Sequence, residues 1–324
     1  MAEWLIEEGI GEHRAVRIEG GEIAEARLDW PGALAAGQVE DAVLVSRSSG
    51  SRRGTARFAS GQEALVDRLP RDASEGATIR LEITRPAMAE RARRKLAQAR
   101  PTDAAPRPAP TLAEALRDEG HDVRVVRRFA EGDWDELWLE AWSGVVDFDG
   151  GALAFFDAPA MTLVDVDGDQ PPAALAQACI EPLARAIRRF DLAGSIGVDF
   201  PTLQEKAQRR VVDDALAKAL AGWPHERTAM NGFGFVQIVA RLARVPMTAR
   251  IAIARPSAAA RRLLRVAERV DGAGATLLTC HPAVKARLKS EWLGELARRT
   301  GREVRIETAP ALALEAGHAQ IVPR

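Results

Sequence analysis

Residues 161–172 read "MTLVDVDGDQPP" and place three aspartates directly after an apolar run. Asp165 and Asp167 stand two positions apart. A strand that continues through both would therefore direct their carboxylates from the same face of a sheet. Two like charges side by side repel each other unless a cation, a proton or water separates them. The stretch leaves two alternatives open, a metal site or a solvated turn.

The next segments predict how this strand pairs. "PPAALAQACIEPLARAIRRF" predicts a helix opened by prolines, and "GSIGVDF" predicts a short strand that ends near Asp199. "PTLQEKAQRRVVDDALAKALAG" then predicts a second helix, with Thr202 and Glu205 in capping-box positions. The order strand, helix, strand, helix favours parallel pairing of the two strands with a right-handed crossover.

Parallel pairing would bring Asp165 and Asp199 to one edge of the sheet, where open α/β sheets hold their ligands. Mg²⁺ is typically held by one or two carboxylates while it keeps several waters. In the alternative, Asp167 or Asp169 caps the following helix, and Asp199 ends its strand in solvent. The spacing alone does not decide between the two.

The composition excludes several classes of protein. The chain has 324 residues, 47% hydrophobic and 28% charged, with a net charge of −1, so a polyanion would have to bind a local basic patch. Cys179 and Cys280 match no disulfide framework and no zinc-ligand spacing. No signal peptide and no apolar run long enough to span a bilayer is recognised, which favours a cytoplasmic location and no membrane partner.

The first hundred residues predict a small β-barrel. Several short strands follow one another at close spacing, with a tight turn at Gly20-Gly21. "AMAERARRKLAQAR", residues 87–100, predicts a basic helix, and "PTDAAPRPAPT", residues 101–111, predicts a linker. Mixed α/β structure is expected beyond it, beginning with the helix "TLAEALRDEG". In the helix "GDWDELWLEAWSG", the stripe of Trp134, Trp138 and Trp142 favours core packing over base stacking.

Four motifs stand in an order that resembles the catalytic region of the ribonuclease E/G family. They are "TLVDVDG", "GSIGVDF", "EKAQRRVVDDALAKAL" and "ERTAMNGFGFVQIVAR", which match an Asp-x-Asn strand, a Val-Ile-Asp-Phe strand, an arginine-bearing helix and an Arg-Thr strand. The stretch that begins "ATLLTCHPAVKARL" resembles the small terminal domain of that family. Residues 1–100 match its N-terminal part more weakly.

The resemblance implies an α/β fold with an RNase H-like and DNase I-like catalytic core, an OB-fold RNA-binding module and a small C-terminal α/β domain. In chain order it implies the first part of the RNase H-like element (1–34), the OB-fold module (35–98), a linker (99–111), the second part of the RNase H-like element (112–149), the DNase I-like catalytic domain (150–245) and the C-terminal domain (246–324).

The resemblance also implies roles for single residues. Asp165 and Asp199 match the two metal-binding aspartates, and Arg227 matches an arginine near the scissile phosphate. Asp167 stands where the family has an asparagine, so it is a candidate third metal ligand. Phe58 matches an aromatic of the RNA-binding module. Further candidates for RNA contact lie beside that phenylalanine and on the helix after Asp199: Arg52, Arg53, Arg57, Lys206, Arg209 and Arg210.

The chain departs from the family pattern in two further ways. The paired cysteines of the zinc link are missing, since "VPMTARIAIARPS" has no cysteine. Zinc and a zinc-linked tetramer are therefore not expected. A homodimer is expected by analogy, and a monomer stays open as the alternative for a chain without the zinc link. A short linker also stands where the family carries the domain that senses the RNA 5′ monophosphate.

The implied activity is Mg²⁺-dependent endonucleolytic hydrolysis of single-stranded RNA in RNA processing or decay, leaving 5′-phosphate and 3′-hydroxyl ends, with Mn²⁺ as a substitute metal. Two other functions remain open at this point. One is an RNA-binding or ribosome-associated protein with the same fold and no activity, and the other is a metal-dependent nuclease that acts on DNA. No Walker-type loop, GxSxG elbow or histidine cluster points to a different chemistry.

Overall fold

The computed structural model describes residues 3–324 except 90–93 and 159. Its first layer is a four-stranded sheet with the order β11-β1-β2-β3, in which β1 pairs in parallel with β11. The strands are β1 (Trp4–Gly9), β2 (Glu12–Glu19), β3 (Glu22–Asp29) and β11 (Val123–Val126). Helix α1 (Leu112–Asp118) packs on this sheet and begins at a capping box of Thr111 and Glu114. The predicted helix "TLAEALRDEG" is thus confirmed.

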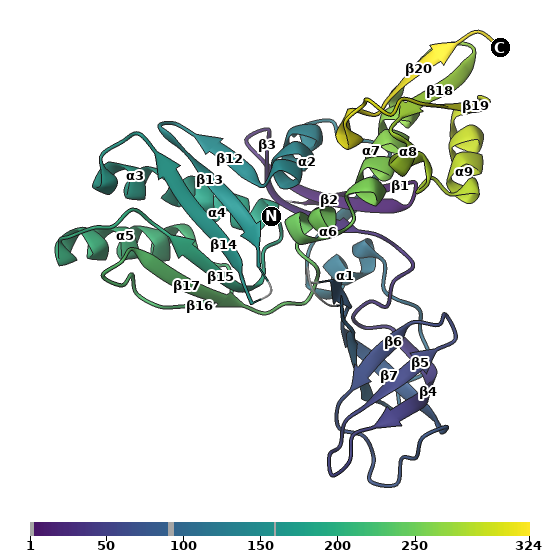
Figure 1. Ribbon diagram of the computed structural model, residues 1–324, viewed down its shortest axis with the longest axis horizontal. Coiled ribbons are helices and arrows are strands. Elements are labelled where there is room, and N and C mark those ends of the chain that lie inside the picture. Colours follow the sequence, from purple (N-terminus) through teal and green to yellow (C-terminus); the bar gives the residue numbers. More distant parts are fainter. Residues whose placement is uncertain (1–2, 90–93, 159) are drawn as a thin grey trace.

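A closed five-stranded barrel with the order β10-β6-β5-β4-β7 is inserted between β3 and α1. Its strands are β4 (Val39–Arg47), β5 (Gly54–Phe58), β6 (Glu63–Val66), β7 (Thr78–Arg85) and β10 (Ala97–Pro101). The predicted small barrel is confirmed for the strands from Val39 onward, but the strands on either side of Gly20-Gly21 belong to the four-stranded sheet and not to the barrel. Figure 1 shows the barrel projecting away from the large sheet of the molecule.

The helix predicted over residues 87–100 is wrong. Short strands β8 (Met88–Ala89) and β9 (Arg94–Lys95) pair with each other, and β10 closes the barrel; residues 90–93 lie outside the described part. In β10, Ala97 and Ala99 are buried in the barrel core and alternate with the less buried Gln98 and Arg100. This period of two is that of a strand, and tertiary burial outweighs the helical propensity of alanine and arginine.

Helix α2 (Trp134–Ser143) carries the tryptophan stripe into the main core. The side chain of Asp133 accepts a hydrogen bond from the backbone N–H of Glu136 at 2.9 Å and so caps the helix. Trp134, Trp138 and Trp142 are at most 7% exposed. The prediction that this stripe serves core packing is confirmed.

The largest layer is a six-stranded sheet with the order β12-β13-β14-β15-β17-β16. Its strands are β12 (Val145–Phe148), β13 (Gly151–Asp157), β14 (Thr162–Gly168), β15 (Gly194–Asp199), β16 (Glu226–Arg227) and β17 (Phe235–Ala240). Strands β14 and β15 pair in parallel, as predicted. The helices α3 (Pro172–Ala178), α4 (Ile180–Arg189) and α5 (Lys206–Ala219) contact one another and cover one face of this sheet (Figure 1).

The start of α5 differs from the prediction. The helix begins at Lys206 with Glu205 at the N-cap position, and no side chain caps it. Thr202 does not act as the cap, because its Oγ1 lies 3.4 Å from the carbonyl oxygen of Phe233 and donates to it. The predicted capping box of Thr202 and Glu205 is therefore wrong, since a contact across the sheet edge takes the hydroxyl.

The C-terminal part is a three-stranded sheet with the order β19-β18-β20, packed against α7. Helices α6 (Met247–Ile253) and α7 (Arg255–Arg269) lead into β18 (Ala275–Cys280), α8 (Pro282–Lys285), α9 (Ser290–Thr300), β19 (Val304–Thr308), a 3₁₀ turn (Leu314–Ala316) and β20 (His318–Val322). His281 caps α8, because its ring nitrogen Nδ1 accepts a hydrogen bond from the N–H of Ala283 at 3.0 Å. Within the described part, no helix combines the length and apolarity that crossing a membrane requires.

Candidate metal-binding face

Asp165 and Asp199 lie directly opposite each other in the structure. The parallel register of β14 and β15 pairs these two residues, so their Cα atoms are neighbours across the strands. Both side chains are exposed. Neither carboxylate has a hydrogen-bond or ion-pair partner among the residues that the structure describes. The pairing of β14 with β15 thus places two negative charges side by side, and no positive group of the described residues neutralises them.

The two aspartates stand on the face of the sheet that the helices leave open. Val164, Val166 and Val198 alternate with them and are buried on the helix-covered face. Alternation with a period of two places Asp165 and Asp199 on the opposite, solvent-exposed face. The predicted parallel pairing that brings Asp165 beside Asp199 is confirmed.

Two adjacent unpartnered carboxylates suit a hard divalent cation. Mg²⁺ takes oxygen ligands and is commonly bound through one or two carboxylates, with waters completing its octahedron. Asp167 lies two positions further along the same face, but its Oδ1 accepts from the N–H of Gly168 at 2.9 Å. No group of three acidic, histidine or cysteine side chains in the described part lies close enough to hold one ion. The donor set that the structure brings together is therefore Asp165 and Asp199, without Asp167.

Arg227 lies on the other face of the sheet. It pairs with Ile238, which in turn pairs with Ile196 and is buried under the helices. Its guanidinium donates to Oδ1 of Asp213 in α5 at 3.0 Å and to the backbone carbonyl of that residue at 2.8 Å. The structure thus does not bring Arg227 together with the aspartates. Its predicted position beside the scissile phosphate is wrong, because Arg227 instead links β16 to α5 through its hydrogen bonds to Asp213.

The other basic side chains predicted for RNA contact near the aspartates belong to α5. The helix begins seven positions after Asp199, and both Lys206 and Arg210 are exposed on it. Arg209 is half-buried, and its Nη1 donates to the carbonyl oxygens of Leu203 and Gln204. Arg209 thus holds the loop that precedes the helix, whereas Lys206 and Arg210 remain available to an anion.

The barrel arginines are engaged in local contacts. Arg52 donates to the carbonyl oxygen of Leu69 at 2.8 Å, Arg53 pairs with Asp67 at 2.7 Å, and Arg57 pairs with Glu63 at 2.8 Å. All three arginines nevertheless lie at the barrel surface, where exposed ion pairs contribute little to stability.

Phe58 does not lie at the barrel surface. It is 2% exposed and belongs to the barrel core. A buried ring cannot stack on a base, so its predicted role in RNA binding is wrong. In "GTARF" the side chains of β5 alternate, and Phe58 falls on the same inward face as Ala56.

Two exposed phenylalanines near the aspartates were not among the predicted site residues. Phe156 is 56% exposed on β13, and Phe233 is 82% exposed in the loop before β17. A sequence signal existed for the first, because Phe155 and Phe156 are adjacent and a strand buries only one of two neighbours. The second stands in "NGFGF", where Asn231 and Gly232 indicate a turn, and turn tips are exposed.

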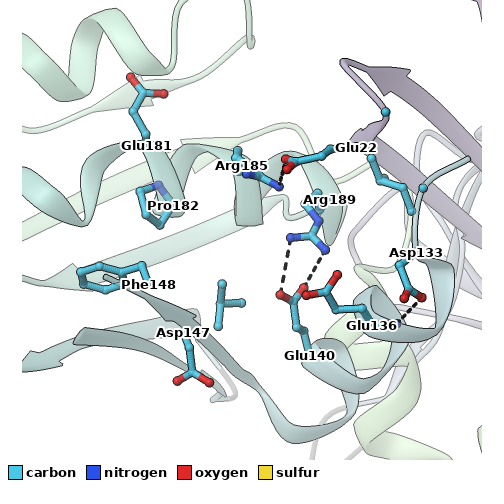
Figure 2. A pocket seen from close by; sticks show the side chains of 14 residues that line it. Glu22, Asp133, Glu136, Glu140, Asp147, Phe148, Glu181, Pro182, Arg185 and Arg189 are labelled. Carbon is cyan, nitrogen blue, oxygen red and sulfur yellow. Dashed lines mark hydrogen bonds and ion pairs between the residues drawn. The ribbon is translucent and has the colours of Figure 1, made fainter. Parts of the chain in front are cut away.

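A cavity of about 570 Å³ lies elsewhere, between the β2–β3 turn, the start of α2, β12 and α4. Figure 2 shows Arg189 facing Glu140 across it, and their side chains approach to 2.9 Å. Burial raises the pKa of Glu140 and outweighs the lowering effect of Arg189. Neither Asp165 nor Asp199 lines this cavity, so it is separate from the candidate metal site.

Comparisons with known proteins identify no family for this chain. No protein-family model matches the chain, and no curated protein matches its sequence.

Proposed function

We propose that the protein is a Mg²⁺-dependent endoribonuclease that hydrolyses phosphodiester bonds of single-stranded RNA in RNA processing or decay and leaves 5′-phosphate and 3′-hydroxyl ends. The observation that carries this proposal is the in-register pair of Asp165 and Asp199 on the open face of the six-stranded sheet. The order of motifs that resembles the ribonuclease E/G family supports it. The proposed RNase H-like, OB-fold, DNase I-like and C-terminal domains keep the boundaries given above.

Asp165 and Asp199 would hold the metal ion, with Mn²⁺ as a substitute and no zinc. A bound Mg²⁺ supplies a Lewis acid for a phosphoryl oxygen and lowers the pKa of a coordinated water. The chain itself fixes the position of the two carboxylates through the register of β14 and β15. The buried core on the other face of the sheet holds these strands in place. Lys206 and Arg210 at the start of α5 would attract the RNA backbone, because cations and a helix N-terminus both favour phosphate.

A second candidate function is RNA binding without catalysis. The position of Arg227 favours this alternative, since the guanidinium expected to stabilise the transition state is bound to Asp213 on the opposite face. A protein of this kind would keep the surface that binds RNA and would not cut it. A DNA nuclease is the third candidate, and a substrate comparison excludes or supports it.

The test compares the wild-type protein with Asp165→Asn and Asp199→Asn on 5′-labelled single-stranded RNA, in Mg²⁺ and in EDTA. We expect cleavage only with metal, and a loss on the order of 100-fold or more in each variant, because each removes a charged ligand. Asp214→Asn is the matched control, since that exposed aspartate lies on α5. It should cut like the wild type.

Three further readouts separate the candidates. The product ends are identified by whether a kinase or a ligase accepts them, and 5′-phosphates are expected. A wild-type protein that binds the RNA and never cuts it, with either Mg²⁺ or Mn²⁺, would support the binding protein instead. Equal cleavage of single-stranded DNA would support the third candidate. Light scattering tests the proposed homodimer, and cell fractionation tests the proposed cytoplasmic location.

A further inference from the structure

Only two phenylalanine or tryptophan rings of this molecule are exposed to solvent. The chain has nine phenylalanines, seven tryptophans and no tyrosine, and the structure describes all of them. Only Phe156 and Phe233 are classed as exposed, at 56% and 82%. Large aromatic side chains normally gain free energy by burial, so a ring that remains in water is an informative exception.

Phe156 lies on the open face of the sheet, on the amino-terminal side of the aspartates. It stands opposite Leu163 in β14, two positions before Asp165. Two residues of a strand span about 6.6 Å, so Phe156 is a diagonal neighbour of Asp165 on the same face of the sheet. The exposed Leu163 extends this apolar surface.

Phe156 also stands at the rim of a cavity of about 610 Å³. The cavity is bounded by the ends of α2 and β13, the starts of β14 and β15, and α6. Met161, Ala249 and Ala252 line it, so an apolar surface continues from the ring of Phe156 into the cavity.

Phe233 lies on the other side of the aspartates, beyond the carboxyl end of β15. Phe233 stands two positions before Phe235, and Phe235 pairs with Asp199. Its loop is held in place, because the N–H of Phe233 donates to Oδ1 of Asn231 at 2.8 Å and its carbonyl accepts from Thr202. The exposed ring is therefore presented by an ordered backbone at the sheet edge where Asp199 lies.

We infer that Phe156 and Phe233 are stacking platforms for two nucleobases of a single-stranded RNA, one on each side of the phosphate held at Asp165 and Asp199. The inference rests on the proposed function and adds the residues that position the substrate. A base on Phe156 would lie at the rim of the cavity.

The charge of the open face is the physical reason for aromatic platforms there. Asp147 and Asp167 lie on the same face as the metal-binding pair, and both are exposed. A phosphate backbone is repelled by these four carboxylates except where a cation intervenes. A stacked base requires no such compensation, because ring stacking does not depend on the charge of the phosphate. Binding free energy on this face is thus expected from the bases, and duplex RNA, whose bases are already stacked, should bind more weakly.

The experiment measures binding of a fluorescein-labelled 12-nucleotide RNA by anisotropy, with Ca²⁺ in place of Mg²⁺ to limit cleavage. Phe156→Ala and Phe233→Ala should each weaken binding by about 5- to 150-fold, the loss that corresponds to one stacked base. The tryptophan variants at both positions should retain it. Leu139→Ala is the control, since Leu139 is 44% exposed on α2. It should bind like the wild type.

A second measurement locates the contacts. RNA that carries single 5-iodouridines is irradiated on the wild-type protein, and the cross-linked peptides are identified by mass spectrometry. Cross-links to Phe156 and Phe233 should come from nucleotides on opposite sides of the cleavage site.

The outcomes separate this inference from the proposed function. If the wild type cuts RNA and both alanine variants bind and cut normally, the platforms are refuted and the nuclease stands. If the wild type neither cuts nor binds RNA, both are refuted. If Phe156→Ala changes only the oligomeric state seen by light scattering, the face binds a second copy of the chain, and the inference is wrong.

Discussion

Replacing Arg227 with glutamine distinguishes the role that the structure shows from the catalytic role expected from the sequence. The guanidinium makes three hydrogen bonds, to the carboxylate of Asp213 at 3.0 Å, to the backbone carbonyl of Asp213 at 2.8 Å and to the carbonyl of Thr228 at 3.2 Å. Both side chains of the ion pair are less than one-fifth exposed. A hydrogen bond to a charged group is worth about 1.5–3 kcal/mol, and glutamine retains part of it. We therefore expect Arg227→Gln to lower the free energy of unfolding by about 2 kcal/mol.

The assay combines urea unfolding with the cleavage measurement. Asp213→Asn is the second arm, and the double variant completes a cycle whose coupling energy should be about 1–2 kcal/mol. Asp213 also accepts from the N–H of Met230, so its loss should cost at least as much as the loss of Arg227. Cleavage by Arg227→Gln at low temperature should fall by less than about tenfold, since the folded fraction remains high. Unchanged unfolding together with a cleavage loss on the order of 100-fold would refute this reasoning and restore Arg227 to catalysis.

Two further predictions follow from burial. Burial raises the pKa of Glu140 in the folded state above its ordinary value. The contribution of Glu140 to stability is therefore greatest below that ordinary value and is lost as the pH rises through the raised pKa. In urea titrations, the free energy of unfolding of the wild type relative to Glu140→Gln should decrease as the pH rises above the ordinary pKa of glutamate. Phe58→Ala should destabilise the barrel by about 3–5 kcal/mol, because it empties a ring-sized space in the core, and limited proteolysis should detect earlier barrel opening. Unchanged barrel stability with weakened RNA binding would contradict the burial of Phe58.

The sequence by itself determined the pair of aspartates. Alternation in "TLVDVDG" and "GSIGVDF" is a local property, and the helix between the strands leaves parallel pairing as the favoured connection, so the position of Asp165 beside Asp199 was predictable. The tryptophan stripe of α2 was predictable for the same reason, because one apolar face of a helix seeks burial.

Other features depended on contacts between segments that are distant in the chain. Arg227 belongs to a two-residue strand, too short to show which face it presents, and only its pairing with Ile238 places it under the helices. Residues 97–100 carry a composition typical of a helix, and only the closing of the barrel between β6 and β7 makes them a strand. Which aromatics remain in solvent was likewise decided by the tertiary structure, since every strand has two faces and only packing shows which of them is covered.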